Sequence, residues 1–266
     1  MLIIGEKINS SRKNIKEMVE SKKKEFIQEL ARKQVEGGAQ MLDLNIGTIR
    51  KNEPENMQWL VKEVQEAVNV PLCIDSPNHK AIKEGLKVYD WSKGKALINS
   101  VTAEREKLEL ILPLVKKYQC SIVALTMNEQ GIPQDSKERF KIADELIKKL
   151  TGEGIPIEDI YIDPLTLPVS ANIQNSNIVL ETLKRIKDSY PEVKIIIGLS
   201  NISYGLPERR LINQGFVVLA VACGLDAVIL DSTDQKIMAL IKATNLLLGK
   251  DEFCRQYLKA FRERKL

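Results

Sequence analysis

Short apolar runs alternate along this chain with longer segments in which apolar residues recur at helical spacing. The apolar runs cover residues 2–5, 41–45, 71–75, 95–100, 121–127, 159–164, 194–200 and 227–232. Most are apolar throughout instead of at every second position, which is typical of strands covered on both faces in a parallel sheet. The chain is therefore predicted to form eight buried parallel strands.

Amphipathic helices are predicted between and after these runs. They cover residues 23–38, 55–68, 103–118, 135–150, 177–188, 209–224, 234–249 and 251–264. Eight strands alternating with helices in 266 residues predict one α/β domain over 1–266, a single (β/α)8 TIM barrel. The alternative, a doubly wound open sheet, usually has a glycine-rich phosphate turn after its first strand, and residues 5–14 (GEKINSSRKN) do not provide one.

Polar residues follow nearly every predicted strand. In chain order they are Glu6 and Asn9, Asp43 and Asn45, Asp75, Asn99, Asn128, Asp163, Ser200 and Asn201, and Asp231. Each alone is a common turn or cap residue, but in a barrel these strand ends share one face, where active sites lie. Carboxylates accept hydrogen bonds and carboxamides both donate and accept. The set therefore suits a heterocycle with a 2-amino-4-oxo pyrimidine edge.

Composition and sequence pattern argue against several other classes of protein. The net charge is +4 and aromatic residues make up 5% of the chain, so a nucleic-acid-binding surface is not expected. No apolar run is long enough to span a membrane, and the first residues do not resemble a signal peptide, which predicts a cytoplasmic protein. The four cysteines have no metal or redox spacing.

Side-chain chemistry narrows the candidates further. A single histidine, His79, excludes multi-histidine metal sites, and it is expected to cap a helix or face solvent. Asp43, Asp75 and Asp163 form no compact metal-ligand motif, so no metal is predicted. A phosphate ligand would need lysine or arginine at the strand ends, where such residues are sparse. A sugar ligand would need aromatic platforms there, and these are missing. Neither ligand is therefore expected.

Seven segments, in constant order, closely resemble one protein family. They are MLDLNIG, LCIDSPN, ALINSVTAEREK, LTMNEQGIPQDS, YIDPLTLP, GLSNIS and LAVACGLDAVI. The family is that of the methyltetrahydrofolate:corrinoid/iron–sulfur protein methyltransferases. These are pterin-binding barrels related to the folate domain of cobalamin-dependent methionine synthase and, more remotely, to dihydropteroate synthase. The resemblance covers essentially the whole chain.

This resemblance implies a homodimer that transfers the N5-methyl group of 5-methyltetrahydrofolate to Co(I) of a corrinoid. The corrinoid would be carried by a separate corrinoid/iron–sulfur protein, as in the acetyl-CoA pathway. The implied pterin-binding residues are Asp75, Asn99, Asp163, Gly198, Ser200, Asn201 and Arg209, with Asn201 as the catalytic amide. Asp75 and Asp163 are expected to bind the pterin edge in their ionised form.

Three alternatives stay open at this point. The corrinoid protein could belong to an O-demethylase or methylamine system, with tetrahydrofolate as the methyl acceptor. A dihydropteroate synthase is less consistent with the sequence, because GLSN and LDSTDQK stand where that enzyme has a Ser-Arg-Lys string and a Ser-x-His-Arg loop. A folate-binding protein without activity is disfavoured by the Asn201 motif.

Overall fold

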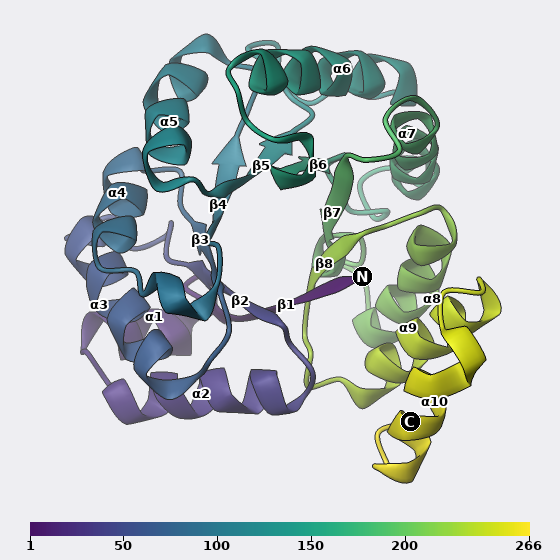
Figure 1. Cartoon of the computed structure of the whole chain (residues 1–266), viewed down its shortest axis with the longest axis horizontal. Helices are drawn as coiled ribbons and strands as arrows, with labels where there is room; N and C mark the ends of the chain where they lie inside the picture. The colour runs from purple at the N-terminus through teal and green to yellow at the C-terminus, as the bar shows by residue number, and fades with distance from the viewer.

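The computed structural model describes residues 1–266 and contains eight parallel strands that close into a barrel in chain order (Figure 1). The strands are β1 (Leu2–Asn9), β2 (Met41–Asn45), β3 (Leu72–Asp75), β4 (Leu97–Val101), β5 (Ser121–Leu125), β6 (Ile160–Asp163), β7 (Lys194–Gly198) and β8 (Ala227–Leu230). Because β1 pairs with both β2 and β8, the sheet has no free edge. The predicted (β/α)8 barrel is confirmed.

Ten α-helices surround the strands (Figure 1). They are α1 (Lys13–Glu20), α2 (Lys24–Glu36), α3 (Glu53–Ala67), α4 (His79–Lys87), α5 (Arg105–Tyr118), α6 (Ser136–Gly152), α7 (Asn175–Ser189), α8 (Arg209–Ala222), α9 (Gln235–Leu247) and α10 (Arg255–Arg262). The helices that the apolar spacing did not predict are α1 and α4, which have 8 and 9 residues. Such short helices contain few apolar repeats, so their period is hard to detect.

Side chains of successive strand residues point alternately into the barrel and out toward the helices. The inward positions at one level form an apolar layer with one residue from each strand. These residues are Ile4, Met41, Cys73, Leu97, Val123, Tyr161, Ile196 and Ala227. The outward positions, such as Leu42, Ile74 and Ile162, pack in a separate core of 58 buried residues between strands and helices. We refer to the inner layer as the barrel floor.

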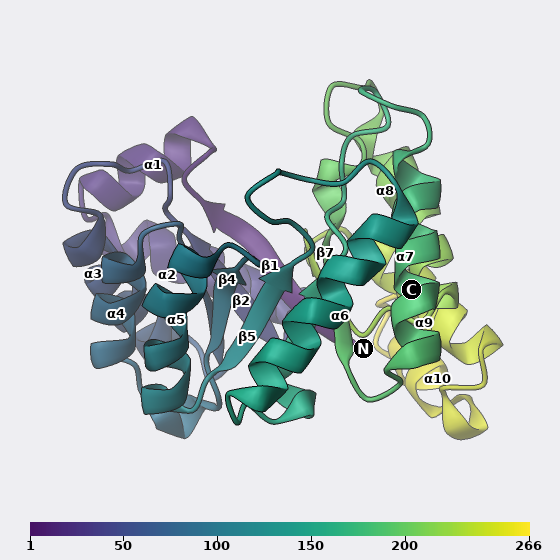
Figure 2. The ribbon, with the colours of Figure 1, turned by 90° about the horizontal axis from the view of Figure 1, so that it is seen from above.

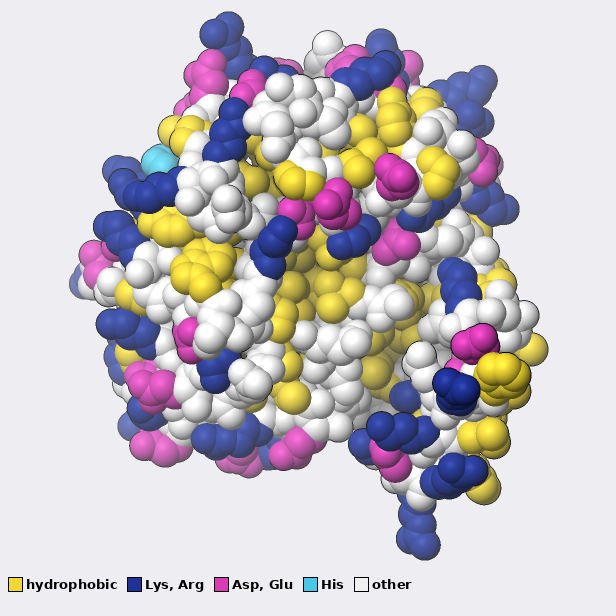
Figure 3. Space-filling model, viewed as in Figure 1, with side chains coloured by type: hydrophobic (Ala, Val, Ile, Leu, Met, Phe, Trp, Pro, Cys, Tyr) yellow, Lys and Arg dark blue, Asp and Glu magenta, His cyan; other side chains and the backbone are white.

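The two ends of the barrel differ in character. Figure 3 shows the end on which the N-terminus lies, where hydrophobic side chains occupy the centre and charges of both signs surround them. In Figure 2 the strands run away from that end, and the loops after β6 and β7 extend beyond the helices on the opposite side. The polar strand ends therefore lie together at this opposite end of the barrel, which we call the mouth.

None of the helices combines the length and apolar character needed to cross a lipid bilayer.

Arg139 of α6 fastens the loop that follows β6. Its side chain is fully buried, and its Nη1 donates to the carbonyl oxygens of Pro164 (2.6 Å) and Leu165 (2.7 Å). Its Nε donates to the carbonyl oxygen of Pro133 at 2.9 Å. Three backbone carbonyls from two loops thus depend on one guanidinium, and Asp163 lies directly before the fastened loop.

We expect Arg139→Met to lower the free energy of unfolding by about 2–4 kcal/mol, because it leaves three carbonyl groups without their donor. Urea unfolding followed by circular dichroism measures this change. The control is Arg185→Met, since Arg185 is exposed on α7. An Arg139→Met protein as stable as the control would contradict the role given to this side chain.

Candidate functional site

A polar layer lies directly above the barrel floor. Two residues after the floor position, where side chains again point inward, the strands carry Glu6, Asp43, Asp75, Asn99, Leu125, Asp163, Gly198 and Ile229. Five of these eight positions are carboxyl or carboxamide groups. The strands thus gather hydrogen-bonding groups in one layer at the mouth, as the polar strand ends predicted.

Asp75, at the end of β3, is the centre of a hydrogen-bonded cluster. Its Oδ2 accepts from Nδ2 of Asn45 at 2.6 Å and from Nδ2 of Asn99 at 3.3 Å. Burial raises the pKa of Asp75 to about 7, although the bond from Asn45 acts in the opposite direction. Asn45 was noted as a strand-end residue but was not among the predicted site residues. The sequence does carry a signal for it. Asn45 lies four residues after the floor residue Met41 on the same strand, so its side chain points to the same side of the sheet as that of Met41.

Asp43 lies deeper than Asp75, on β2. It is almost fully buried, and its Oδ1 has no hydrogen-bond partner. Burial and the neighbouring carboxyl group of Asp75 raise the pKa of Asp43 well above its usual value. This pair of carboxyl groups therefore favours a neutral Asp43 below a titratable Asp75.

Asp163, at the end of β6, is also an acceptor and is half-buried. Its Oδ1 accepts the backbone N–H of Leu165 at 2.7 Å. Burial raises the pKa of Asp163 to about 7, opposed by the Leu165 bond and by the positive charge of Arg139. Asp75 and Asp163 thus both titrate near neutral pH, so the ligand-free site is less negatively charged than two fully ionised carboxylates would make it.

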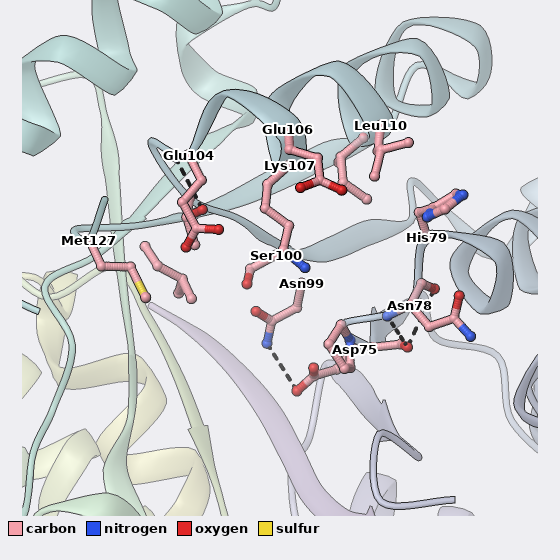
Figure 4. Close-up of a pocket in the computed structure, with 15 residues that line it drawn as sticks. Asp75, Asn78, His79, Asn99, Ser100, Glu104, Glu106, Lys107, Leu110 and Met127 are labelled. Atoms are coloured by element: carbon pink, nitrogen blue, oxygen red, sulfur yellow. Dashed lines mark hydrogen bonds between the residues drawn. The ribbon is translucent and has the colours of Figure 1, made fainter. Parts of the chain in front are cut away.

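A cavity of about 500 Å³ opens above this cluster on the β3–β5 side of the mouth (Figure 4). Asp75 and Asn99 line its base, and Met127 lies at one side. Lys107 of α5 reaches toward Asn99 and Ser100 in Figure 4, and it has no ion-pair partner. Sequence analysis missed Lys107 because it follows the strand by a loop and a turn of helix. The cavity can therefore accept a ligand with both donor and acceptor atoms.

His79 also lines this cavity. It is the first residue of α4, but the residue that caps the helix is Asn78, whose side chain accepts from the backbone N–H of Lys80 at 3.0 Å. Of the two roles expected for His79, capping the helix is wrong, and its side chain is partly exposed to solvent at the cavity. Its place at the cavity follows from the short turn between β3 and α4.

Gly198 and Asn201 form a second part of the mouth, at the end of β7. A short 3₁₀ turn, η3 (Leu199–Asn201), follows the strand and leaves Asn201 exposed with no hydrogen bond from its amide. A Cβ atom at Gly198 would lie 3.2 Å from Nδ2 of Asn201. The missing side chain at Gly198 therefore leaves room for the Asn201 amide.

Ser200 and Arg209 lie together on the β7–β8–β1 side. The hydroxyl of Ser200 donates to the carboxylate of Glu6 at 2.9 Å, and Arg12 contacts the same carboxylate at 3.1 Å. Arg209 donates through Nη2 to the carbonyl oxygen of Ser200 at 2.6 Å. Arg209 thus supports the segment that carries Asn201, and it lines a smaller cavity than Asp75 and Asn99 do.

The structure brings all seven predicted site residues to the mouth, but in three groups. Asp75 and Asn99 share one side, Asp163 stands alone on β6, and Gly198, Ser200, Asn201 and Arg209 follow β7. No group of three or more histidine, cysteine or carboxylate side chains is arranged to hold a metal ion. The groups that the site presents are hydrogen-bond donors and acceptors.

Residues 6–231 match the family model described as "Pterin binding enzyme". Over its whole length the chain is 36% identical to a methylcorrinoid:tetrahydrofolate methyltransferase of Eubacterium limosum, of which it covers 98%. It is also 27% identical, over 88% of its length, to a methionine synthase of Mycobacterium tuberculosis. It covers only 20% of that longer protein.

The fold is similar to that of solved dihydropteroate synthases. The TM-score is 0.71 for the Xanthomonas albilineans structure and 0.65 for the Yersinia pestis structure, at 18% and 15% identity. The similarity covers 93% of this chain in both cases, and 92% and 93% of those chains. At such low identity only the barrel architecture is shared. The family match and the full-length relative together show that the chain belongs to the pterin-binding enzymes, among their methyltransferases.

Proposed function

We propose that this enzyme transfers a methyl group between N5 of tetrahydrofolate and the cobalt of a corrinoid that a separate protein carries. The name of the Eubacterium limosum relative, similar over the full chain, supports both substrates. The observation that carries the proposal is the buried cluster of Asp75, Asn45 and Asn99 at the base of the 500 Å³ cavity. A cluster of acceptors and amides in a partly apolar cavity suits the pyrimidine edge of a pterin.

The pterin would be held by its hydrogen-bonding edge. Asp75 and Asp163 accept from the amino group and ring N–H of the pterin, and Asn99 supplies an amide. Since both carboxyl groups titrate near pH 7, they lose their protons readily when such donors approach. The pterin edge then replaces the water that a buried carboxylate needs.

Asn201 is the proposed catalytic residue. When the methyl group leaves N5, that nitrogen gains electron density and needs a proton or a hydrogen-bond donor. In the opposite direction N5 of tetrahydrofolate attacks the methyl carbon, the cobalt–carbon bond breaks with its electron pair left on cobalt as Co(I), and N5 loses the proton that it carried. The exposed amide of Asn201, unbound within the protein and unobstructed by Gly198, can rotate to present either its N–H or its carbonyl group.

The two directions of transfer pass through one transition state, so the same residues serve both. The name of the Eubacterium limosum relative gives the direction from methylcorrinoid to tetrahydrofolate. We propose this direction, in which tetrahydrofolate is the methyl acceptor, as in the alternative with an O-demethylase or methylamine corrinoid protein. A corrinoid/iron–sulfur partner and the acetyl-CoA pathway, the first interpretation, would use the opposite direction.

A homodimer is also proposed. Leu211, Leu219 and Leu247 are exposed on α8 and α9, with 69%, 52% and 85% of their surface accessible. Exposed leucines on two neighbouring helices suit a covered face, because isolated chains rarely leave such groups in contact with water. A cytoplasmic location stays a prediction from the sequence.

Asn201→Ala tests the catalytic role of this amide. We expect the rate of single-turnover methyl transfer to fall by about 10²–10³-fold, with little change in pterin affinity or Tm, because the amide that hydrogen-bonds N5 in the shared transition state is lost. Rapid mixing of enzyme, tetrahydrofolate and methylated corrinoid protein, followed by the absorbance of the corrinoid, measures this rate. An unchanged rate in Asn201→Ala would exclude this assignment.

Affinity for the pterin should depend on pH. Because pterin N–H groups bind the ionised forms of Asp75 and Asp163, and both have pKa values of about 7, affinity for 5-methyltetrahydrofolate should rise between pH 6 and pH 8. Binding near pH 7 should release protons. Calorimetry in two buffers of different ionisation enthalpy detects this release. Proton uptake on binding would contradict it.

Asp163→Asn should change stability and pterin affinity in opposite directions. The raised pKa of Asp163 means that its contribution to stability is present at acidic pH and is lost as pH rises through 7. Asp163→Asn should therefore raise the Tm at pH 8, by about 2–4 °C for each 1 kcal/mol gained in the free energy of unfolding. The same substitution should weaken pterin binding.

The matched control is Asp188→Asn, at an exposed position of α7. It should change neither the Tm nor pterin affinity. If Asp163→Asn lowered the Tm at pH 8, burial would not be the dominant influence on Asp163.

A further inference from the structure

A second cavity, of about 160 Å³, lies on the β7–β8–β1 side of the mouth. Its polar lining consists of Glu6, Arg12, Ser200, Arg209, Arg210, Asn213, Asp231 and Asp234. Of this set only Ser200 and Arg209 are among the predicted site residues. The cavity begins one residue away from Asn201, where the reacting nitrogen would lie.

The three carboxylates of this cavity already have partners. Glu6 binds Ser200 and Arg12, and Asp231 forms an ion pair with Lys7 at 2.7 Å. Asp234 caps α9, where it accepts the backbone N–H groups of Lys236 and Ile237 at 3.1 and 3.2 Å.

Two of the three guanidinium groups, in contrast, have no carboxylate partner. Arg209 donates only to neutral oxygens, the carbonyl of Ser200 and the hydroxyl of Ser203. Arg210 forms no hydrogen bond or ion pair, and no side chain caps the first turn of α8, where both arginines lie. The unneutralised charge of the cavity is therefore positive.

Asn213, one turn further along α8, supplies an independent observation. It is only 8% exposed, and its Oδ1 has no hydrogen-bond partner. Buried side-chain acceptors without a partner are uncommon, because losing water without replacement is costly. Since Asn213 lines the same cavity, a ligand that carries an N–H group would satisfy it.

A carboxylate next to an amide N–H is the chemistry of an N-acyl glutamate. In a folate this group ends the tail that leaves C6, the carbon beside N5, at the end of the pterin away from the pyrimidine edge. With that edge on Asp75 and N5 near Asn201, C6 would lie on the β7 side of the mouth, and a tail that leaves it toward α8 would reach the second cavity. The exposed ring of Tyr204, next to Arg209, offers a flat surface for the benzoyl spacer.

We propose that this cavity binds the glutamyl tail of the folate, with Arg210 and Arg209 on a carboxylate and Asn213 on the amide N–H. This proposal rests on the proposed function, because it assumes that the substrate is a folate. Arg210 and Asn213 then determine preference for the length and charge of the tail, and they take no part in the methyl transfer.

The test compares 5-methyltetrahydrofolate with its 6-anilinomethyl analogue, which keeps the benzene ring but lacks the carbonyl group and the glutamate, by calorimetry. The wild-type protein should bind the glutamyl ligand about tenfold more tightly or better, with a preference that falls as salt is added. Arg210→Gln should remove most of this preference and leave the affinity for the analogue unchanged. Asn213→Leu should also reduce the preference, with no loss of Tm.

Arg185→Gln, an exposed change on α7, serves as the control for altered net charge. Equal affinity of the wild-type protein for both ligands would overturn the tail site and leave the proposed function intact. The same holds if Arg210→Gln weakened both ligands equally. If the wild-type protein bound neither ligand, the proposed function itself would fail.

Discussion

The burial of carboxyl groups above an apolar barrel floor is the constraint on which this site depends. Closure of the barrel brings eight strand ends together, and the layer of Met41, Cys73 and their neighbours below admits no water. A carboxylate placed there loses hydration, so its pKa rises until a donor from a neighbour or a ligand replaces the water. The protein supplies only part of that replacement, through Asn45, Asn99 and the backbone of Leu165.

The unsatisfied remainder is what a pterin can bind. Asp43 and Asp75 together cannot both carry a charge at low cost, which favours a neutral Asp43 and leaves Asp75 as the acceptor at the cavity base. Native stability and ligand affinity are therefore opposed at these positions. The cost is met elsewhere in the fold, by the continuous apolar packing between strands and helices.

The sequence predicted the barrel because each buried strand is a compact apolar run and most helices are long enough to show their period. It also predicted Asp75, Asn99 and Asp163 as mouth residues, because each stands at the end of an apolar run and the strand ends of a barrel share one face. Lys107 and Arg139 could not be predicted in this way. Both reach their targets across loops, where side-chain direction depends on tertiary contacts.

Two other features also needed the structure. The short helices α1 and α4 give too few repeats to be recognised, and the cap of α4 proved to be Asn78 instead of His79. The titration of Asp75 and Asp163 near pH 7 depends on burial, which no residue pattern reports directly. For the two carboxyl groups, what the sequence lacked was the distance between groups far apart in the chain.

Cys73, in the barrel floor two residues before Asp75, has a consequence for selectivity. Burial and the carboxyl groups of Asp43 and Asp75 raise the pKa of its thiol well above the usual value. If the proposed methyl transfer takes place at the mouth, a thiolate below it would compete for the methyl group and inactivate the protein by alkylation. Cys73 is fully buried and held as a thiol, so it packs as a small apolar side chain instead.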